Sequence, residues 1–119
     1  MKYDFEVIRG DTLAFSVVID ANGDTVDPDA IRMTARRALT DTVLYEISDS
    51  GATPTGAGTI TANGTTPNKW DFVVAPEATE DATPGAYDYD VEFTIDGAVN
   101  TPIYGIMRLV KDASRPAEV

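Results

Sequence analysis

The residues of this chain whose types and spacing could do chemistry are three carboxylates in its most regular stretch, Asp88, Asp90 and Glu92. Side chains alternate between the two faces of a β-strand, so these three carboxylates are expected to share one face. Carboxylates grouped in this way can transfer protons or bind calcium. Arg32 and Arg36 are spaced similarly in an earlier alternating stretch. We therefore predict that the two stripes pair across neighbouring strands, each pair stabilising the fold by about 0.2–1 kcal/mol, with calcium binding and catalysis as the alternatives.

The residue types that are missing exclude much catalytic and metal chemistry. The sequence contains no histidine and no cysteine, so disulfides, thiolate metal sites, cysteine nucleophiles and histidine-dependent sites are impossible within it. Asp20, Asn22 and Asp24 resemble the start of a calcium loop, but Gly23 lies inside the triplet and no glutamate stands at the twelfth position. We predict a turn at Asn22-Gly23, no enzymatic activity, and no catalytic, cofactor-binding or metal-binding residues.

Two short features have both a functional and a structural interpretation. Arg9-Gly10-Asp11 matches the tripeptide that integrins recognise, but Gly10 separates two alternating runs. We interpret the tripeptide as the turn between two strands. Trp70 is interpreted as an anchor of the core rather than as an exposed platform for a ligand.

The bulk composition describes one acidic domain. The 119 residues, 43% of them hydrophobic and 24% charged, fit a single globular unit. The net charge of −11 repels nucleic acid phosphates and anionic lipid, so neither nucleic acid nor membrane is expected as a partner. The first residues alternate instead of forming the apolar run of a signal peptide. We expect a protein that is made in the cytoplasm.

Alternation with a period of two dominates the chain and predicts half-buried strands. The stretch 31–36 has helix as a rival, because Arg, Met and Ala favour helices, but we predict a strand from its alternation. Asp96-Gly97 is predicted to be the turn of a hairpin, residues 49–58 a loop, and residues 77–80 a helical turn. Strands are expected at residues 3–7, 13–19, 31–36, 43–47, 59–61, 70–74, 87–95 and 99–110.

These short strands with turn signals between them predict an all-β fold, an immunoglobulin-like antiparallel β-sandwich of about seven to eight strands. The sandwich is expected to span residues 1–111, followed by a polar C-terminal tail at 112–119. Tyr87 and Tyr89 stand where a tyrosine often closes the corner before the penultimate strand by a hydrogen bond to the upstream backbone. The core is expected around four aromatic residues, Phe15, Trp70, Tyr89 and Phe93.

Several segments carry a resemblance to a known family: RGDTLAF at 9–15, PGAYDYDV at 84–91, IDG at 95–97, YG at 104–105 and DASRP at 112–116. Together they resemble small immunoglobulin-like structural proteins of tailed bacteriophages and prophages. The N-terminal domain of phage baseplate upper proteins is similar in style. The resemblance spans nearly the whole chain.

The resemblance implies a non-catalytic virion protein, a decoration or adaptor subunit that docks in multiple copies on a capsid, neck, tail or baseplate and needs no cofactor. Baseplate relatives carry a long C-terminal extension that is not seen here, so a stand-alone subunit is expected rather than one that holds a fibre. The alternative is an adhesion module for carbohydrate or a host surface, which an exposed Tyr104 or Trp70 would support. Candidate partner contacts are Tyr3, Phe5, Tyr104, Asp112 and Arg115.

Overall fold

The described part of the chain consists of strands joined by short connections, with one 3-10 turn. A computed structural model describes residues 1–19 and 24–111, and none of these residues forms a helix long and apolar enough to cross a bilayer. The elements are β1 (Phe5–Ile8), β2 (Leu13–Val18), β3 (Ala30–Arg37), β4 (Val43–Ser48), β5 (Gly51–Thr53), β6 (Gly58–Ala62), β7 (Lys69–Val74), η1 (Pro76–Ala78), β8 (Gly85–Ile95) and β9 (Ala98–Val110).

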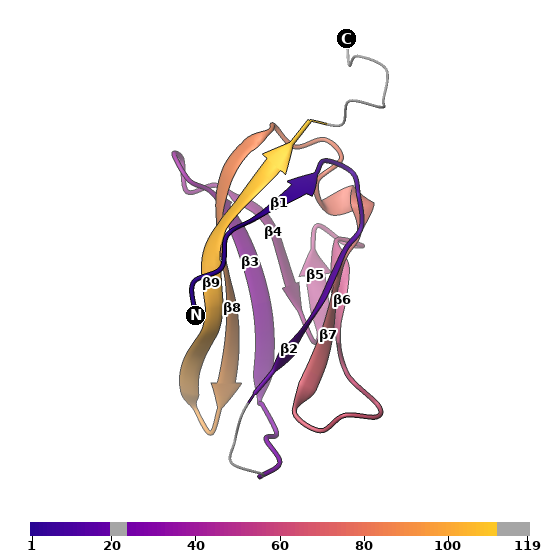
Figure 1. Cartoon of the computed structure of the whole chain (residues 1–119), viewed down its shortest axis with the longest axis vertical. Coiled ribbons are helices and arrows are strands. Elements are labelled where there is room, and N and C mark those ends of the chain that lie inside the picture. Colours follow the sequence, from indigo (N-terminus) through magenta and orange to yellow (C-terminus); the bar gives the residue numbers. More distant parts are fainter. Residues whose placement is uncertain (20–23, 112–119) are drawn as a thin grey trace.

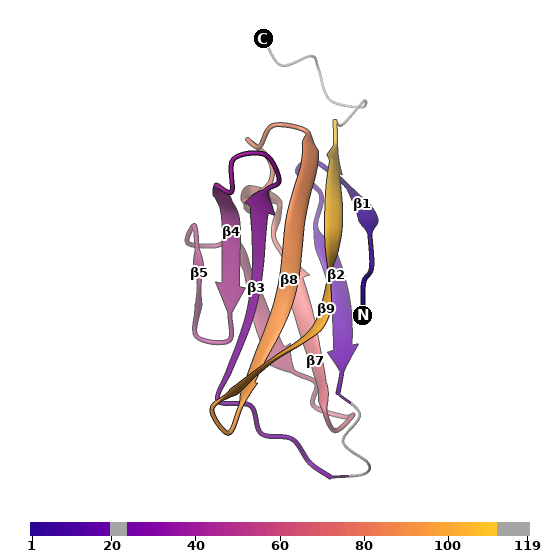
Figure 2. The ribbon, with the colours of Figure 1, turned by 90° about the vertical axis from the view of Figure 1, so that its left-hand side faces the viewer.

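The strands form two sheets that face each other, as the alternation predicted. The large sheet has six strands in the order β1-β9-β8-β3-β4-β5, and the small sheet has three in the order β2-β7-β6. Figure 1 and Figure 2 show the small sheet lying across one face of the large one. β1 runs parallel to β9, whereas the other pairs are antiparallel.

The stretch with a helical alternative forms β3. Met33 and Ala35 are fully buried, whereas Arg32 and Arg36 are exposed. On a helix, residues two apart point in nearly opposite directions, so such a separation of faces requires a strand. The strand prediction is confirmed, and burial against the small sheet outweighs the local helix preference of these residues.

β8 and β9 form the long hairpin that the sequence predicted. Asp96 and Gly97 at its tip have φ angles of 51° and 80°. Two consecutive positive φ angles define the tight turn whose twist matches that of the flanking strands, and Asp-Gly is a preferred pair for it. The register shifts between Val91 and Phe93.

Two details of the strand pattern differ from expectation. The segment 49–58 contains β5, which pairs with the end of β4; its Gly-Ala-Thr sequence has no alternation that could reveal it. Val43 does not follow the alternation that buries Tyr45 and Ile47 of β4, because the register shifts between Ala35 and Arg36. Val43 therefore lies opposite Arg36 and is 40% exposed.

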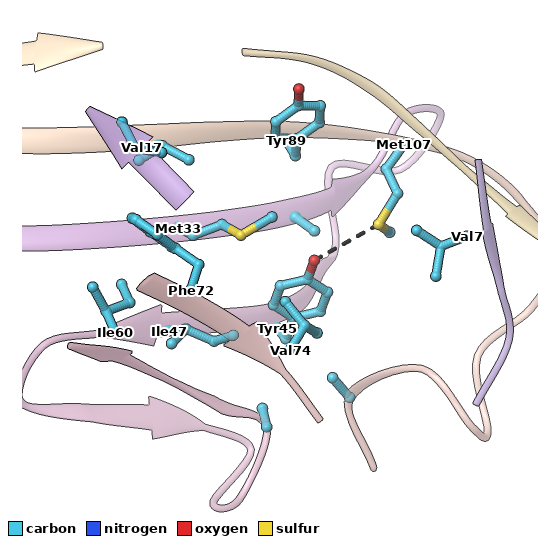
Figure 3. Packing of buried hydrophobic residues seen from close by; sticks show 14 of the residues in the cluster. Val7, Val17, Met33, Tyr45, Ile47, Ile60, Phe72, Val74, Tyr89 and Met107 are labelled. Carbon is cyan, nitrogen blue, oxygen red and sulfur yellow. Dashed lines mark hydrogen bonds between the residues drawn. The ribbon is translucent and has the colours of Figure 1, made fainter. Parts of the chain in front are cut away.

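The core lies between the sheets and is apolar and aromatic. Trp70 packs edge-on against Phe93, with ring centroids 5.1 Å apart. The Tyr45 hydroxyl, which is fully buried, points at the sulfur of Met107 at 3.6 Å (Figure 3). The expected core residues Trp70 and Phe93 are confirmed as buried, while Phe15 is only half-buried.

The predicted tyrosine corner is present before β8. The Tyr87 hydroxyl donates to the Thr83 carbonyl at 2.6 Å and accepts from the Arg37 guanidinium at 3.1 Å. The same guanidinium donates to the Thr83 carbonyl. These bonds satisfy a buried hydroxyl and fix the direction in which the chain enters β8.

Some predictions concern residues outside the described part of the chain. They are the calcium-like triplet from Asp20, the turn at Asn22-Gly23, the tail at 112–119, and the candidate contacts Asp112 and Arg115. The last strand, β9, ends at Val110, next to the predicted end of the sandwich.

Candidate functional site

The carboxylate stripe of β8 lies on the outer face of the large sheet beside the arginine stripe of β3. The register places Arg32 opposite Glu92 and Arg36 opposite Asp88. The Arg32 guanidinium donates to a Glu92 carboxylate oxygen and approaches Glu46 of β4 at 4.0 Å. The predicted cross-strand ion pair is confirmed for Arg32 and Glu92, which links β3 to β8. For Arg36 and Asp88, the predicted placement on neighbouring strands is confirmed.

Asp90, the middle carboxylate of the stripe, lies opposite the uncharged Thr34. Burial, and then the neighbouring Glu92, raise the pKa of Asp90, while Arg32 and Arg36 oppose this rise. A raised pKa alone does not make an acid catalyst, because proton transfer also needs a bound substrate within hydrogen-bond reach. Among the described residues, no group of three or more His, Cys, Asp or Glu side chains is placed to hold a metal ion.

The Arg9-Gly10-Asp11 tripeptide forms the turn between β1 and β2. Arg9 is only 8% exposed, and its guanidinium donates to the Ala82 carbonyl at 3.4 Å. The Gly10 amide donates to the Thr79 hydroxyl at 2.9 Å, and Gly10 has a φ of 81°. The interpretation as a turn is confirmed, since a receptor would need the arginine to extend into solvent.

The aromatic residues that could serve as ligand platforms differ in exposure. Trp70 is 7% exposed and confirmed as a core anchor. Tyr3 and Tyr104 are 53% and 47% exposed. Tyr104 therefore remains as an exposed aromatic, whereas Trp70 cannot stack on a ligand in solution.

The N-terminal segment lies along β9 before β1 begins. The Tyr3 amide donates to the Tyr104 carbonyl at 2.8 Å, and an Asp4 carboxylate oxygen accepts from the Ile106 amide at 2.9 Å. A Cβ added at Gly105 would lie 2.3 Å from the Tyr3 carbonyl oxygen. This close approach requires glycine at position 105.

The candidate contacts in this region point to two different faces. The rings of Tyr3 and Phe5 stack with centroids 5.9 Å apart, and Phe5 packs edge-on against Tyr89 at 5.0 Å. Tyr104 instead lies opposite Asp90, on the outer face of the large sheet. Tyr3 and Phe5 are therefore brought together, and Tyr104 is separated from them.

Tyr89 links the N-terminal segment to the core. Its hydroxyl donates to the Tyr3 carbonyl. Burial, with smaller contributions from Asp4 and Tyr3, raises the pKa of Tyr89 to about 12. The hydroxyl therefore stays protonated and keeps donating this hydrogen bond throughout the neutral and mildly alkaline range.

One lateral side of the sandwich, between β1 and β9 of the large sheet and β2 of the small sheet, is open; we call it the open side. A cavity of about 430 Å³ lies there, lined by Phe5, Leu13, Phe15, Tyr89 and Ile103 among others. A second cavity of about 470 Å³ follows further along β2 and β9. Val18, Ile19, Ile95 and Pro102 help to line this second cavity.

The opposite lateral side, where β6 meets β4 and β5, is filled; we call it the closed side. A Cβ added at Gly58 would lie 2.6 Å from a methyl carbon of Ile47, on β4 of the facing sheet, and 2.1 Å from the carbonyl oxygen of Val73 on the paired strand β7. Ala57 is fully buried and Ile60 is 5% exposed. The two sheets therefore meet without a gap on this side.

The strand order defines the class of the domain. A sheet of β9, β8 and β3 extended by β4 and β5, facing a sheet of β2, β7 and β6, is the arrangement of a variable-type immunoglobulin domain. Tyr89 stands two residues after the corner tyrosine, Tyr87, where antibody domains carry the second cysteine of their disulfide. The chain is an immunoglobulin-like antiparallel β-sandwich.

Comparison with a solved structure agrees with this class. A structure of voltage-gated sodium channel β subunits, described for multimeric cell-adhesive interactions, is similar with a TM-score of 0.55 at 11% identity, over 92% of each chain. The extracellular domains of the sodium channel β4 subunit, described as parallel homodimers, give a TM-score of 0.48 at 13% identity, over 93% of this chain and 92% of that chain. No family model matches this chain, and no curated protein matches it. At these identities the likeness concerns the fold.

The open side was only partly anticipated from the sequence. Tyr3 and Phe5 were chosen by their position near the N-terminus, and they border it. Leu13, Phe15 and Ile103 were expected to be ordinary strand residues. A signal was available in β2, whose sequence Leu-Ala-Phe-Ser-Val-Val carries no charge, although strands at sheet edges are usually protected by charges or proline.

Proposed function

We propose that this chain is a non-catalytic structural protein of a tailed phage particle. It serves as a decoration or adaptor subunit that docks in multiple copies on a larger assembly such as a capsid, neck, tail or baseplate. The observation that carries the proposal is the open side, an apolar surface next to an unprotected edge strand. Such surfaces on stable domains are typical of protein–protein contacts.

The distribution of polar groups supports a binding role over a chemical one. Among the carboxylates of β8, Glu92 is paired with Arg32 across the strands, and Asp88 lies opposite Arg36. The Tyr89 hydroxyl beside the open side already donates to a backbone carbonyl. What remains at the open side is largely apolar, and this favours burial against another protein.

The resemblance of the sequence to phage structural proteins supplies the setting. Particle assembly takes place in the host cytoplasm, where a cysteine-free domain folds without needing oxidation. The net charge of −11 disfavours contact with packaged nucleic acid and favours a protein partner with a basic surface. The adhesion alternative loses one of its two aromatic platforms, because Trp70 is buried.

Purified particles test this proposal. Particles from a producing culture are separated on a density gradient, and the protein is quantified in each fraction against the major capsid protein by mass spectrometry. We expect the protein to co-sediment with particles at a fixed copy number that survives a second gradient. Finding it only as free protein at the top of the gradient would overturn the virion assignment.

A further inference from the structure

We propose that the open side is a strand-acceptor site: it binds an extended segment of a partner protein that alternates apolar residues with lysine or arginine and adds to the edge of β2. This inference rests on the proposed function, because it names the surface and the partner chemistry of the same docking role. An added strand gains main-chain hydrogen bonds along the edge and places alternate side chains in the groove beside it.

β2 is an edge strand without the usual protection. It pairs with β7 on one side and has no strand on the other among the residues described. Its six residues include no charged side chain and no proline. By contrast, the edge strand β5 is only three residues long and is followed by Pro54, and the edge strand β1 carries Glu6. Short edges, charges and proline prevent unwanted pairing. The fourth edge strand, β6, also has no charge and no proline, but it contacts β4 and β5 of the facing sheet on the closed side. Among the described residues, β2 is therefore the unprotected edge that has an open groove beside it.

The groove beside β2 is shaped for one row of apolar side chains. Leu13 and Phe15 point inward from β2 but remain half-buried. Across the groove lie Phe5 and Ile103, which are also half-buried. An added strand would direct every second side chain into this gap and complete the burial of these four residues.

Charge selects the partner. Among the described side chains that line the two cavities, the charged one is that of Glu6. Asp11, just before β2 begins, is exposed and also acidic. A second copy of this chain would bring another net charge of −11 to the interface. A segment whose solvent-facing residues are lysine or arginine instead gains from the acidic surroundings. We therefore assign the site to a basic strand rather than to a second copy.

Synthetic peptides probe the site directly. A nine-residue capped peptide alternating valine and lysine is titrated into the isotopically labelled full chain, and amide shifts are followed by NMR. Two further peptides serve as comparisons, one alternating valine with glutamate and one with the valines and lysines grouped in blocks. We expect shifts centred on β2 and on Phe5, with binding of the alternating lysine peptide at least about tenfold tighter than that of either comparison peptide.

Matched charge variants on the two edges of the small sheet sharpen the test. Ala14 on β2 and Thr61 on β6 are both exposed on the outer face of that sheet. Ala14→Lys should weaken binding of the lysine peptide about threefold to tenfold, and Ala14→Glu should strengthen it by a similar factor. Thr61→Lys and Thr61→Glu should have a clearly smaller effect. Raising the salt concentration should weaken binding of the lysine peptide.

Each contrary result overturns the assignment. Shifts confined to β6 or to the outer face of the large sheet would place docking elsewhere. Equal binding of the glutamate peptide, or no binding by the lysine peptide, would remove the charge argument. A sedimentation result showing self-association that Ala14→Lys abolishes would make a second copy the occupant.

The proposed function and this site can fail separately. If the protein co-sediments with particles and Ala14→Lys is incorporated as well as the wild type, the virion role stands and the strand-acceptor site fails. If the lysine peptide binds β2 but the protein never appears in particles, the site stands and the virion role fails.

Discussion

At both lateral sides of this sandwich an edge strand of the small sheet faces the large sheet, but the two sheets are in contact on one side and leave a gap on the other. On the closed side, Gly58 lets β6 come so close to the facing sheet that a single added carbon would overlap a methyl group of Ile47 on β4. On the open side, the first strand pairs with β9 in the large sheet, and β2 has β7 as its single neighbouring strand among the described residues. Apolar cavities remain there between the two sheets.

The difference shows how one choice of pairing creates a surface. If the N-terminal strand lay beside β2, it would cover the groove and protect the edge. Its alignment with β9 is secured instead by the Tyr3–Tyr104 backbone bond and by the Tyr89 hydroxyl. The bonds that hold the N-terminal segment on the large sheet therefore also keep β2 available.

Truncation of one aliphatic side chain on each side should show the largest contrast. Ile60→Ala on the closed side is expected to lower the free energy of unfolding by about 2–5 kcal/mol, because it leaves a cavity in a filled region. Leu13→Ala on the open side should cost about 1 kcal/mol or less, because Leu13 is only half-buried. Urea denaturation of both variants measures this. Equal losses would show that the groove is filled in solution.

The sequence predicted the sandwich well because alternation reports burial on one face of a strand. The pairing of the arginine stripe with the carboxylate stripe was also predictable, because Arg32 and Glu92 belong to alternating rows on strands that neighbour each other in this fold class. The parallel pairing of the first strand was not predictable. Tyr3 and Phe5 alternate in the same way whichever sheet they join, and Gly105, which makes room for them, lies far away in the sequence.

Substitution of Gly58 or Gly105 by alanine should show whether the backbone beside each glycine can move to make room for the added carbon. Gly58→Ala is expected to cost about 1–3 kcal/mol of unfolding free energy, because the Val73 backbone cannot move without disturbing β7. Gly105→Ala meets the Tyr3 carbonyl, which belongs to a segment at the chain's start. We expect a smaller global loss, with amide exchange of Tyr3 faster by about tenfold or more. Unchanged exchange at Tyr3 would contradict the close approach.

Removal of the Tyr89 hydroxyl tests what holds the N-terminal segment. Tyr89→Phe should cost about 0.5–1.5 kcal/mol of unfolding free energy through the lost bond to the Tyr3 carbonyl. Tyr45→Phe is the control, since its hydroxyl donates to the Met107 sulfur, a weak acceptor. We expect a clearly smaller cost for the control in thermal denaturation. A reversed order would show that the open side is not anchored in this way.

The carboxylate stripe of β8 lies away from both lateral sides, and its variants are expected to change stability least. The pKa of Asp90 is raised in the folded state, so its ionised form is disfavoured there, and the stability linked to its protonation is lost as pH rises. Asp90→Asn should therefore raise the melting temperature slightly at pH 7, and the gain should disappear below about pH 4, where the carboxyl of the unfolded chain is also protonated. Asp88→Asn, opposite Arg36, should bring no gain at pH 7.

Thiol labelling tests the central contrast most directly, because the chain has no cysteine of its own. Leu13→Cys and Ile60→Cys place a single thiol at inward positions on the two edge strands of the small sheet. We expect native Leu13→Cys to react with a small thiol reagent within about tenfold of the rate of an exposed Val18→Cys reference, and Ile60→Cys to react at least about a hundredfold more slowly. Equal protection at positions 13 and 60 would contradict an open side.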